Sequence, residues 1–364
     1  MEDYPIINKK AAKQIIGSKT IRKEAKRRYH KGSRKVLKNY LGKLIALETE
    51  ELFGEETDQV MSCREPSTLT GSELLCLIKE SGLTGMSGNG YPVHKKLEAF
   101  IKTKSKNRIL IVNGVECEPG LLHDEWILKN RWSKIRTGIA YMQQVLAFDK
   151  IILASKTEKE YHTDPVIYEQ VPARYPMGEE HFLIKQILGV SLEKGEYPVD
   201  KGILVMNLQT VYQICKIING CYDGGRFVTL ASIQQGKGRV AYVKSTDSIE
   251  RILNKAMGIP KATEVYAGGG IMNAHKLQKE EQFEAKIMFA AYAKKPEITA
   301  ENPCKHCGKC VRKCPQGIDV RKIVSIRQKD SNADISIYQP EQCIHCGTCT
   351  YFCRASINIG ELIS

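Results

Sequence analysis

The sequence predicts an α/β domain with a parallel sheet, followed by a strand-rich segment and a helical C-terminal segment that contains most of the cysteines. Apolar runs at residues 109–112, 151–154 and 203–206 alternate with helical segments, which is typical of parallel strands joined by helices. Short strands with alternating apolar residues follow between residues 225 and 278. Eight of the thirteen cysteines then lie in two matching runs near the C-terminus.

The composition fits a folded protein of several domains. The chain has 364 residues, of which 42% are hydrophobic and 26% charged, and a chain of this length typically forms two or three domains. It contains no uncharged apolar run of ~18 residues, the length that a membrane-spanning helix needs. The acidic start at residues 1–4 is unlike a signal peptide, and the cysteines suit a reducing compartment. We therefore expect a cytoplasmic protein without a transmembrane segment.

Residues 1–70 are expected to form a basic helical segment. Much of the net charge of +14 is concentrated here, because residues 9–43 contain fourteen Lys or Arg residues and one acid, Glu24. Such a run is often only the solvated face of a helix, and it also suits an acidic protein partner or an anionic surface. No nucleic-acid-binding motif accompanies the charge, so DNA is not an expected partner.

A glycine-rich loop at residues 82–92 lies between two predicted helices. The first helix has Ser72 as its expected N-cap and Gly82 as its C-cap, and the second covers residues 94–100. Frequent glycines let the backbone approach a ligand closely, and successive N–H groups in front of a helix bind phosphate. Such a loop is also a common turn. Because it follows a helix rather than a strand, it is not the opening of a Rossmann fold.

Polar residues follow two of the predicted strands, at the edge where α/β sheets bind ligands. The strand at 109–112 leads into the segment 113–119, and the strand at 203–206 leads into Asn207. A helix is expected between them, from Glu180 to Leu188. This edge of the sheet is therefore a candidate binding site.

The strand-rich segment is predicted to contain strands at residues 226–230 and 239–243 and a helix at residues 248–257. From Lys286 onward the chain is expected to be helical, with one helix at residues 321–328 between the two cysteine runs.

The two cysteine runs have the spacing of [4Fe–4S] ligands. Both follow the pattern C-x₂-C-x₂-C-x₃-C, and only the first is followed by proline, Pro315. Zinc sites usually have two C-x₂-C pairs separated by a longer gap, and disulfide frameworks belong to small secreted chains. His306 and His345 lie inside the loops and are candidates to tune the clusters through hydrogen bonds to sulfur. Because the other run supplies the fourth ligand in two-cluster ferredoxins, we expect one cluster on Cys304, Cys307, Cys310 and Cys353, and a second on Cys343, Cys346, Cys349 and Cys314.

The order of the motifs resembles a known family. Four motifs follow the order found in the flavin-binding core of the NADH-oxidising subunit of respiratory complex I: the glycine loop with Tyr91-Pro92-Val93-His94, the segment 113–119, Tyr175-Pro176-x-Gly178-x-Glu180, and Asn207-x-x-Thr210. The chain is more similar still to the RnfC protein of the Rnf electron-transport complex and to the cobalamin reductase of propanediol utilisation. The resemblance covers the chain from about Ser72 to the C-terminus.

This resemblance implies a division of the chain into four parts. These are the basic helical segment at 1–70, an α/β domain that binds FMN and NAD(H) at 71–222, a small β-grasp domain of the SLBB type at 223–280, and an α-helical dicluster [4Fe–4S] ferredoxin-type domain at 281–364.

The resemblance also implies roles for individual residues. Contacts with the FMN phosphate and ribityl are implied for Gly85, Gly88, Gly90 and Lys96, and further flavin contacts for Asn113, Gly178, Glu179, Asn207 and Thr210. The acids that line the flavin and nicotinamide would be Glu116, Glu118 and Glu180, and the aromatic residues around the adenine would be Tyr91 and Tyr197. Three positions depart from the family pattern: Ser87 and Asn89 in the glycine loop, and Val115 where the complex I subunit has an acid.

These features lead to three hypotheses. The resemblance favours an NAD(P)H-dependent flavin iron–sulfur oxidoreductase that passes electrons between NAD(H), via FMN, and two [4Fe–4S] clusters to a protein or corrinoid acceptor. The second hypothesis is a non-catalytic iron–sulfur subunit of a larger reductase complex with a degenerate NAD(H) site. The third is a scaffold whose basic N-terminus docks a reductase. The expected partners are an acidic electron carrier, ferredoxin or flavodoxin, or other subunits of a complex, and any membrane association would be peripheral through such a complex.

Overall fold

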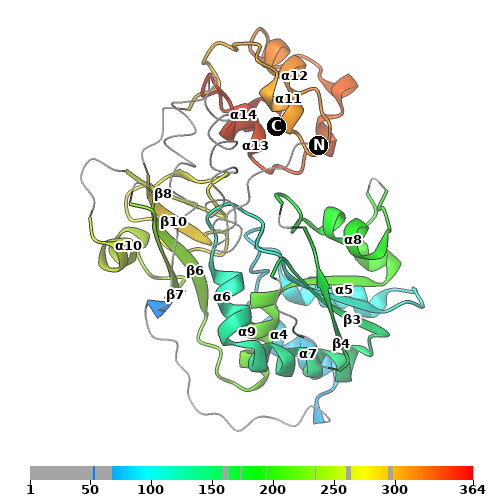
Figure 1. Ribbon diagram of the computed structural model, residues 1–364. Coiled ribbons are helices and arrows are strands. Elements are labelled where there is room, and N and C mark those ends of the chain that lie inside the picture. Colours follow the sequence, from blue (N-terminus) through cyan, green and yellow to red (C-terminus); the bar gives the residue numbers. More distant parts are fainter. Residues whose placement is uncertain are drawn as a thin grey trace, which may run out of the picture.

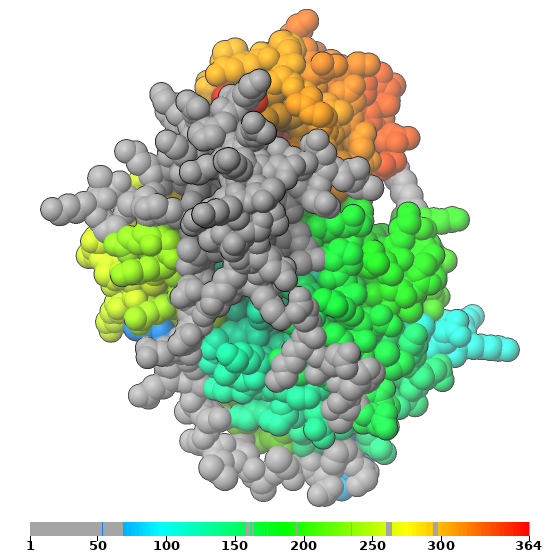
Figure 2. Space-filling view, in the orientation of Figure 1, coloured from blue at the N-terminus to red at the C-terminus, as the bar shows by residue number. Residues whose placement is uncertain are grey.

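The computed structural model describes residues 52–53, 68–157, 161, 164–172, 174–193, 195–233, 235–259, 264–293 and 298–363. Most of the basic N-terminal segment predicted to be helical lies outside these residues, and its described residues Leu52 and Phe53 form a short strand rather than a helix. Three parts are visible in Figure 1: an α/β domain with a parallel sheet, a second sheet beside it, and a group of short helices above both. In the space-filling view the short helices form a separate lobe, coloured orange, above the green and cyan α/β domain (Figure 2).

The α/β domain is built on a four-stranded parallel sheet with the order β4-β3-β2-β5. The central strands β2 (Ile109–Gly114) and β3 (Lys150–Ser155) and the edge strand β5 (Ile203–Asn207) are nearly continuous buried apolar runs, so the three predicted strands are confirmed. The fourth strand, β4 (Val166–Gln170), lies at the other edge and has one buried residue. Its mostly exposed sequence lacks the buried run that identified the others, and we did not predict it.

Among the described residues, six helices accompany this sheet: α4 (Gly71–Glu80), α5 (Val93–Lys102), α6 (His123–Asn130), α7 (Trp132–Leu146), α8 (Glu180–Leu188) and α9 (Leu208–Ile218). Helix α9 is buried along its whole length. Helix α7 packs closely against α9 at Gly138, where a Cβ atom would lie 2.5 Å from the carbonyl oxygen of Val211.

The predicted N-cap of α4 is wrong by two residues. Thr70, not Ser72, caps the helix, and it forms a capping box in which Thr70 and Glu73 each bond the other's backbone. The helix ends with Ser81 as its C-cap, and Gly82 follows with a φ of +66°. The glutamate at position 73, which completes the box only with Thr70, is the signal that would have identified the cap.

The second sheet has six strands in the order β1-β7-β6-β10-β8-β9. They are β1 (Leu52–Phe53), β6 (Gly225–Ser232), β7 (Lys237–Lys244), β8 (Glu264–Gly268), β9 (His275–Lys276) and β10 (Phe289–Ala293). Helix α10 (Ile249–Met257) packs on it through Ile249 and Leu253. The predicted strands near 226–230 and 239–243 and the helix near 248–257 are therefore present.

The expectation that the chain is helical from Lys286 onward is wrong. Residues Phe289–Ala293 form β10, which is buried at all five positions and pairs with β6 in parallel and with β8 antiparallel. Three of these residues are alanines, which favour helix in isolation. Burial on both faces between two strands overrides that preference.

The C-terminal part consists of the short helices α11 (Lys309–Lys313), α12 (Val320–Arg327), α13 (Thr348–Tyr351) and α14 (Ile359–Ile363). Its own small core includes Ile318, Ile323, Ile335 and Ile357. Helix α12 corresponds to the helix predicted at 321–328. Across the part of the chain that the structure describes, none of the helices combines the length and apolar character needed to span a bilayer.

Candidate functional site

A cavity of about 580 Å³ lies at the carboxyl ends of β2 and β5. A volume of this size is typical of cofactor sites. Twelve of the fourteen predicted cofactor residues line it: Gly85, Gly88, Tyr91, Lys96, Asn113, Glu116, Glu118, Gly178, Glu179, Glu180, Asn207 and Thr210. Gly90 and Tyr197 are outside the lining, and Tyr197 lies on an exposed loop before residues 198–201. The structure thus gathers most of a set that spans about 125 residues of sequence.

The glycine loop is closed by its own backbone. The Gly85 N–H donates to the Tyr91 carbonyl at 2.8 Å, and Gly88 and Gly90 adopt φ values of +91° and +67°. The Asn89 side chain accepts from the Tyr91 N–H at 3.2 Å, so this departure from the family pattern is used to close the loop. Thr210 accepts from the Met86 N–H at 3.0 Å and thereby ties the loop to the start of α9.

The loop after β2 is held against the start of α8. Asn113 donates to the Gly178 carbonyl at 2.8 Å and accepts from the Val115 N–H at 3.0 Å. Glycine is required at 178, because a Cβ atom there would lie 2.6 Å from the Val115 carbonyl oxygen. Glu179 caps α8 by accepting from two backbone N–H groups, and the next residue, Glu180, forms an ion pair with Lys96.

Acidic side chains form the buried floor of the cavity. Glu116 accepts from the Asp124 N–H at 2.9 Å, and Asp124 accepts from the Asn207 side chain at 2.9 Å. The second carboxyl oxygen of Asp124 is buried without a hydrogen-bond partner in the structure. Burial raises the pKa of Asp124 well above its ordinary value and also raises the pKa of Glu116. A buried polar atom on the wall of a cavity fits a ligand that has polar groups of its own.

Two buried residues beside these acids, His123 and Lys156, were not predicted from the sequence. Burial lowers the pKa of His123 to about 3, so its imidazole is neutral at ordinary pH, and its Nδ1 lies 3.0 Å from the Thr229 hydroxyl. Lys156, which is also buried, donates to the Glu116 carbonyl oxygen. His123 belongs to no recognised motif. The only sequence signal nearby is the pair of acids, Asp124 and Glu125, in the first turn of α6.

Two loops from outside the α/β domain complete the cavity. One is the segment after β8, which contributes Gly269, Gly270 and Asn273. The other is residues 344–346 of the second cysteine run. A cavity with the predicted flavin residues on one side therefore has a cysteine loop on the other.

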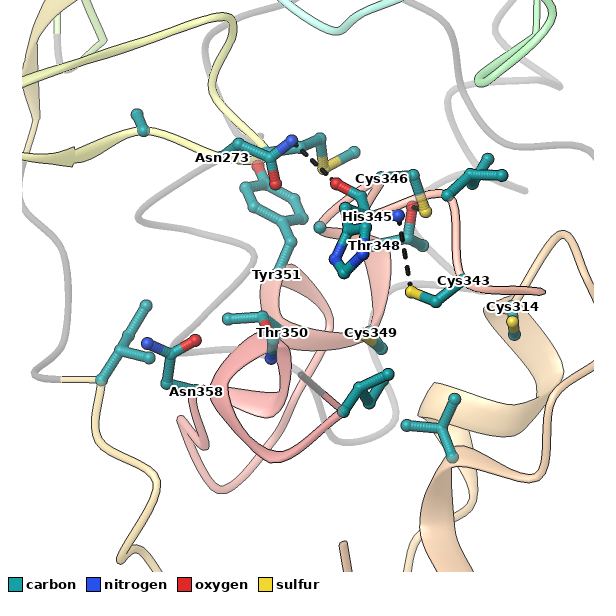
Figure 3. A pocket seen from close by; sticks show the side chains of 18 of the residues that line it. Asn273, Cys314, Cys343, His345, Cys346, Thr348, Cys349, Thr350, Tyr351 and Asn358 are labelled. Atoms are coloured by element: carbon teal, nitrogen blue, oxygen red, sulfur yellow. Dashed lines mark hydrogen bonds between the residues drawn. The ribbon is translucent and has the colours of Figure 1, made fainter. Parts of the chain in front are cut away.

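The cysteines fall into two sets of four. Cys314, Cys343, Cys346 and Cys349 line one cavity of about 940 Å³, where Cys314 reaches the second run from the end of α11 (Figure 3). The remaining four, Cys304, Cys307, Cys310 and Cys353, line a small pocket with Val324 and Ile357. Burial raises the pKa of Cys310 to about 11 and that of Cys349 to about 12.

The donor chemistry of these two sets fits iron–sulfur clusters, which are held by thiolates. Each set has four sulfur atoms, and no disulfide is formed by these cysteines. Among the described residues, no three His, Cys, Asp or Glu side chains are arranged to hold a single metal ion. A cubane does not require such convergence, because each thiolate binds a different iron at a different corner.

The two runs share one backbone conformation. His306 and His345 have φ values of +48° and +50°, and their backbone N–H groups donate to Cys304 and Cys343 sulfur, each at 3.4 Å. Both runs continue into a glycine with positive φ, at positions 308 and 347. The hydrogen bonds to sulfur at these two positions therefore come from the backbone rather than from the imidazole rings.

The chain is similar to known families in two regions. Residues 78–216 match the Nuo51 FMN-binding domain, and residues 303–357 match the 4Fe-4S dicluster domain. Among whole proteins, the RnfC-type component of the ion-translocating oxidoreductase complex of Vibrio cholerae is 27% identical over 262 residues, which cover 68% of this chain and 34% of the relative. The corresponding component of the proton-translocating ferredoxin:NAD(+) oxidoreductase complex of Clostridium ljungdahlii is 25% identical over 313 residues, covering 79% of this chain and 66% of the relative. The chain thus spans about a third of the first of these relatives and about two thirds of the second.

The fold resembles that of a solved oxidoreductase. A chain in the crystal structure of an NAD+-reducing [NiFe]-hydrogenase in the H2-reduced state superimposes with a TM-score of 0.59 at 16% identity, covering 82% of this chain and 62% of that one. This agreement supports the parallel-sheet α/β domain. Together with the flavin-type cavity, the two cysteine sets and the two matched domains, it leads to one conclusion. The comparisons support an RnfC-like family related to the complex I flavin subunit, with a domain for FMN and a domain for two [4Fe–4S] clusters.

Proposed function

We propose that this protein passes electrons between NAD(H) and two [4Fe–4S] clusters through FMN, and onward to a protein or corrinoid acceptor. One observation carries the proposal: the cavity that gathers the predicted flavin residues is also lined by residues 344–346 of the second cysteine run. FMN, when bound, exchanges two electrons as hydride on one side and single electrons on the other. A cysteine loop on the wall of the flavin cavity is the arrangement that such a conversion needs.

Different residues of the chain would bind different parts of FMN. The Gly88 N–H, at the tip of the glycine loop, would bind the phosphate, since Gly88 lines the cavity and the loop is fixed by Thr210. Lys96, which is paired with Glu180, would supply the positive charge beside it. Asp124, with its raised pKa and unpartnered oxygen, would donate or accept a hydrogen bond at the polar edge of the flavin.

The cysteines would bind the clusters in the two sets that the cavities define. One cluster would bind Cys314 from the first run together with three thiolates of the second run. The other cluster would bind Cys353 from the second run together with three thiolates of the first run. The division into an FMN- and NAD(H)-binding domain, a β-grasp domain of the SLBB type and a ferredoxin-type domain belongs to this proposal. The six-stranded sheet would then help to hold the second cysteine run beside the flavin, through Asn273 in the segment after β8.

We further propose that the protein works on the cytoplasmic side as part of a complex or with an acidic electron carrier. The names of the relatives, which are components of ion-translocating and proton-translocating complexes, support partner subunits. The net charge of +14 supports an acidic carrier.

A second candidate function is a non-catalytic electron-transfer subunit without an NAD(H) site. The position of Tyr197 favours it, because this proposed adenine contact is 68% exposed and lies outside the cavity lining. Tyr91 lines the cavity and is 52% exposed, so one of the two aromatic residues remains available to a nucleotide.

Anaerobic purification followed by cofactor analysis separates these functions. We expect FMN and the iron of two [4Fe–4S] clusters per chain, and we expect NADH to bleach the flavin and cluster absorbance together. Glu180→Gln, which breaks the ion pair with Lys96, should lower FMN content, whereas Glu80→Gln on the exposed end of α4 should not. Clusters without FMN would overturn the proposal. Full cofactors with no response to NADH or NADPH would favour the second function.

A further inference from the structure

We infer that the cluster of the second cysteine run faces the flavin, while the cluster of the first run faces a partner and is surrounded by a cationic rim that fits an acidic electron-carrier protein. The inference rests on the proposed function, because it assigns the two ends of the proposed electron path. It depends on three observations: which cysteine loop reaches the flavin cavity, what holds that loop there, and how charge is distributed between the two runs.

Only one of the two cysteine runs reaches the flavin cavity within the described residues. Ile344, His345 and Cys346 line that cavity, and no residue of the run from 304 to 314 does. The pocket of the first run is lined entirely by residues of the C-terminal part. Figure 1 agrees, since α11 and α12 lie on the side of the C-terminal part that is remote from the α/β sheet.

Two hydrogen bonds hold the second run against the cavity. The Tyr175 hydroxyl donates to the Cys346 carbonyl at 2.6 Å, and the Asn273 side chain donates to the His345 carbonyl at 3.1 Å. Figure 3 shows the Asn273 bond directly. Gly347 packs so closely on the same segment that a Cβ atom would lie 2.1 Å from the Asn273 side-chain oxygen. The loop has little freedom to shift at this contact.

The segment that holds the cysteine loop is itself fixed to the flavin side. Glu118 accepts from the Met272 N–H at 2.8 Å, and a Cβ atom at Gly270 would lie 2.1 Å from Glu118 Cγ. The α/β domain, the second sheet and the C-terminal part therefore meet at one junction, defined by Glu118, Tyr175, Asn273 and Cys346. This junction sets the distance between the flavin cavity and the second run.

Charge is distributed very unevenly between the two runs. Residues 303–318 contain four Lys or Arg residues and no acid, and Asp319, Arg321 and Lys322 follow. Residues 339–353 contain one acid, Glu341, and no Lys or Arg, and Arg354 follows. We call Lys305, Lys309, Arg312, Lys313 and Arg321 the cationic rim. Lys305, Arg312 and Arg321 are exposed.

The rim lies directly on the loop of the first cluster. Arg312 donates to the Cys307 carbonyl at 3.1 Å, and Lys305 lies 3.5 Å from the Arg354 carbonyl, which follows Cys353. Positive charge in this position accelerates the approach of a negatively charged partner and orients it toward the cluster. An acidic carrier that docks here would place its own redox centre nearest to the first run, on the opposite side from the flavin.

The test measures docking apart from catalysis. A plant-type [2Fe–2S] ferredoxin serves as the acidic probe, and its association with the holoprotein is followed by stopped flow at low and high salt. The rim variant combines Lys305→Glu with Arg312→Glu. The matched control combines Lys129→Glu with Arg136→Glu, which makes the same change in net charge on exposed positions of α6 and α7. Iron and FMN content and the rate of flavin reduction by NADH are measured for each variant.

We expect the rim variant to associate at least about tenfold more slowly at low salt, and we expect the difference to shrink at about 0.5 M salt, where the Debye length is only a few ångströms. The control should behave like the wild type, and flavin reduction by NADH should be unchanged in both. If charge reversal disturbs the cluster, the neutral pair Lys305→Gln and Arg312→Gln should give an intermediate loss with full iron content.

Equal slowing in rim and control variants, or no slowing in the rim variant, would overturn the inference. Failure of the proposed function would look different. In that case NADH would not reduce the wild type, while salt-dependent association of ferredoxin with dithionite-reduced protein would still distinguish the rim from the control.

Discussion

At the scale of single residues, the burial of the Glu118 side chain determines its protonation state. Burial raises its pKa to about 7, although the Met272 N–H, which donates to the Glu118 carboxyl group at 2.8 Å, opposes the shift. Tyr175 has one hydroxyl hydrogen and donates it to the Cys346 carbonyl. A protonated Glu118 supplies the second hydrogen that this three-residue chain needs.

The pKa of Glu118 predicts how stability changes with pH. The folded protein holds this proton up to about pH 7, whereas an unfolded glutamate releases it near its ordinary pKa of 4.5. Stability is therefore lost as the pH rises from 4.5 through 7, by up to about 3 kcal/mol. Glu118→Gln should remove this loss, so its gain in Tm over the wild type should grow from pH 5 to pH 8. Scanning calorimetry measures this gain, and a gain that is constant with pH would contradict the assigned pKa.

Tyr175→Phe tests a single hydrogen bond of the junction, the one from the Tyr175 hydroxyl to the Cys346 carbonyl. The variant keeps the ring and loses one hydroxyl, which should cost about 1 kcal/mol of stability. It should also slow electron transfer from flavin to clusters and change the electron paramagnetic resonance spectrum of one cluster only. Tyr141→Phe is the control, because its hydroxyl makes a 2.9 Å bond to Asn219 inside the α/β core. Identical spectra and rates in the two variants would show that Tyr175 has no positioning role.

Gly178→Ala tests the close contact between Gly178 and the Val115 carbonyl at the wall of the cavity. Because the new Cβ would lie 2.6 Å from the Val115 oxygen and 3.2 Å from the Cys117 sulfur, the loop must shift, at a cost of roughly 1–3 kcal/mol. We expect reduced FMN content by released-flavin analysis. Gly71→Ala, where the nearest atom would be 3.6 Å away, should retain FMN. Full flavin occupancy in Gly178→Ala would show that the cavity does not depend on this contact.

At the scale of elements, the sequence predicted those strands and helices that a local residue pattern determines. The strands β2, β3 and β5 are continuous apolar runs, and α8 and α10 begin and end at recognisable caps, so periodicity identifies them. Two strands depend instead on their neighbours. Strand β4 is an exposed edge, and β10 is an alanine-rich run that becomes a strand only between β6 and β8.

A buried ion pair between Lys216 and Asp223 lies where helix α9 meets the second sheet. Lys216 on α9 is 1% exposed, lies 3.0 Å from the Tyr242 hydroxyl of β7 and 3.5 Å from Asp223. Removing one partner leaves a buried charge, so Asp223→Ala should destabilise the protein by about 3 kcal/mol or more. The double variant Asp223→Ala with Lys216→Met should recover much of the loss. Chemical denaturation of the three proteins measures it, and a neutral Asp223→Ala would contradict the role of the pair.

At the scale of the whole molecule, the site is a product of how the three parts pack together. The family resemblance predicted twelve residues of the cavity lining, because these residues lie in or beside four short motifs that can be recognised locally. They did not predict Asn273 or the Tyr175 hydroxyl contact, because these bond to residues 72 and 171 positions away. Contacts of that separation leave no local signal in one sequence. The two fourfold cysteine sets were anticipated because the spacing rule itself includes the exchange between runs.

The most direct test of the account measures magnetic coupling between the flavin and the second-run cluster. The anaerobic protein is partly reduced with NADH, and the FMN semiquinone signal is recorded by power saturation with the clusters oxidised and then reduced. We predict that cluster reduction makes the semiquinone harder to saturate, and that Asn273→Ala, which frees the His345 carbonyl, weakens this effect. A semiquinone whose saturation is the same with oxidised and reduced clusters would contradict a flavin cavity bordered by the second cysteine run.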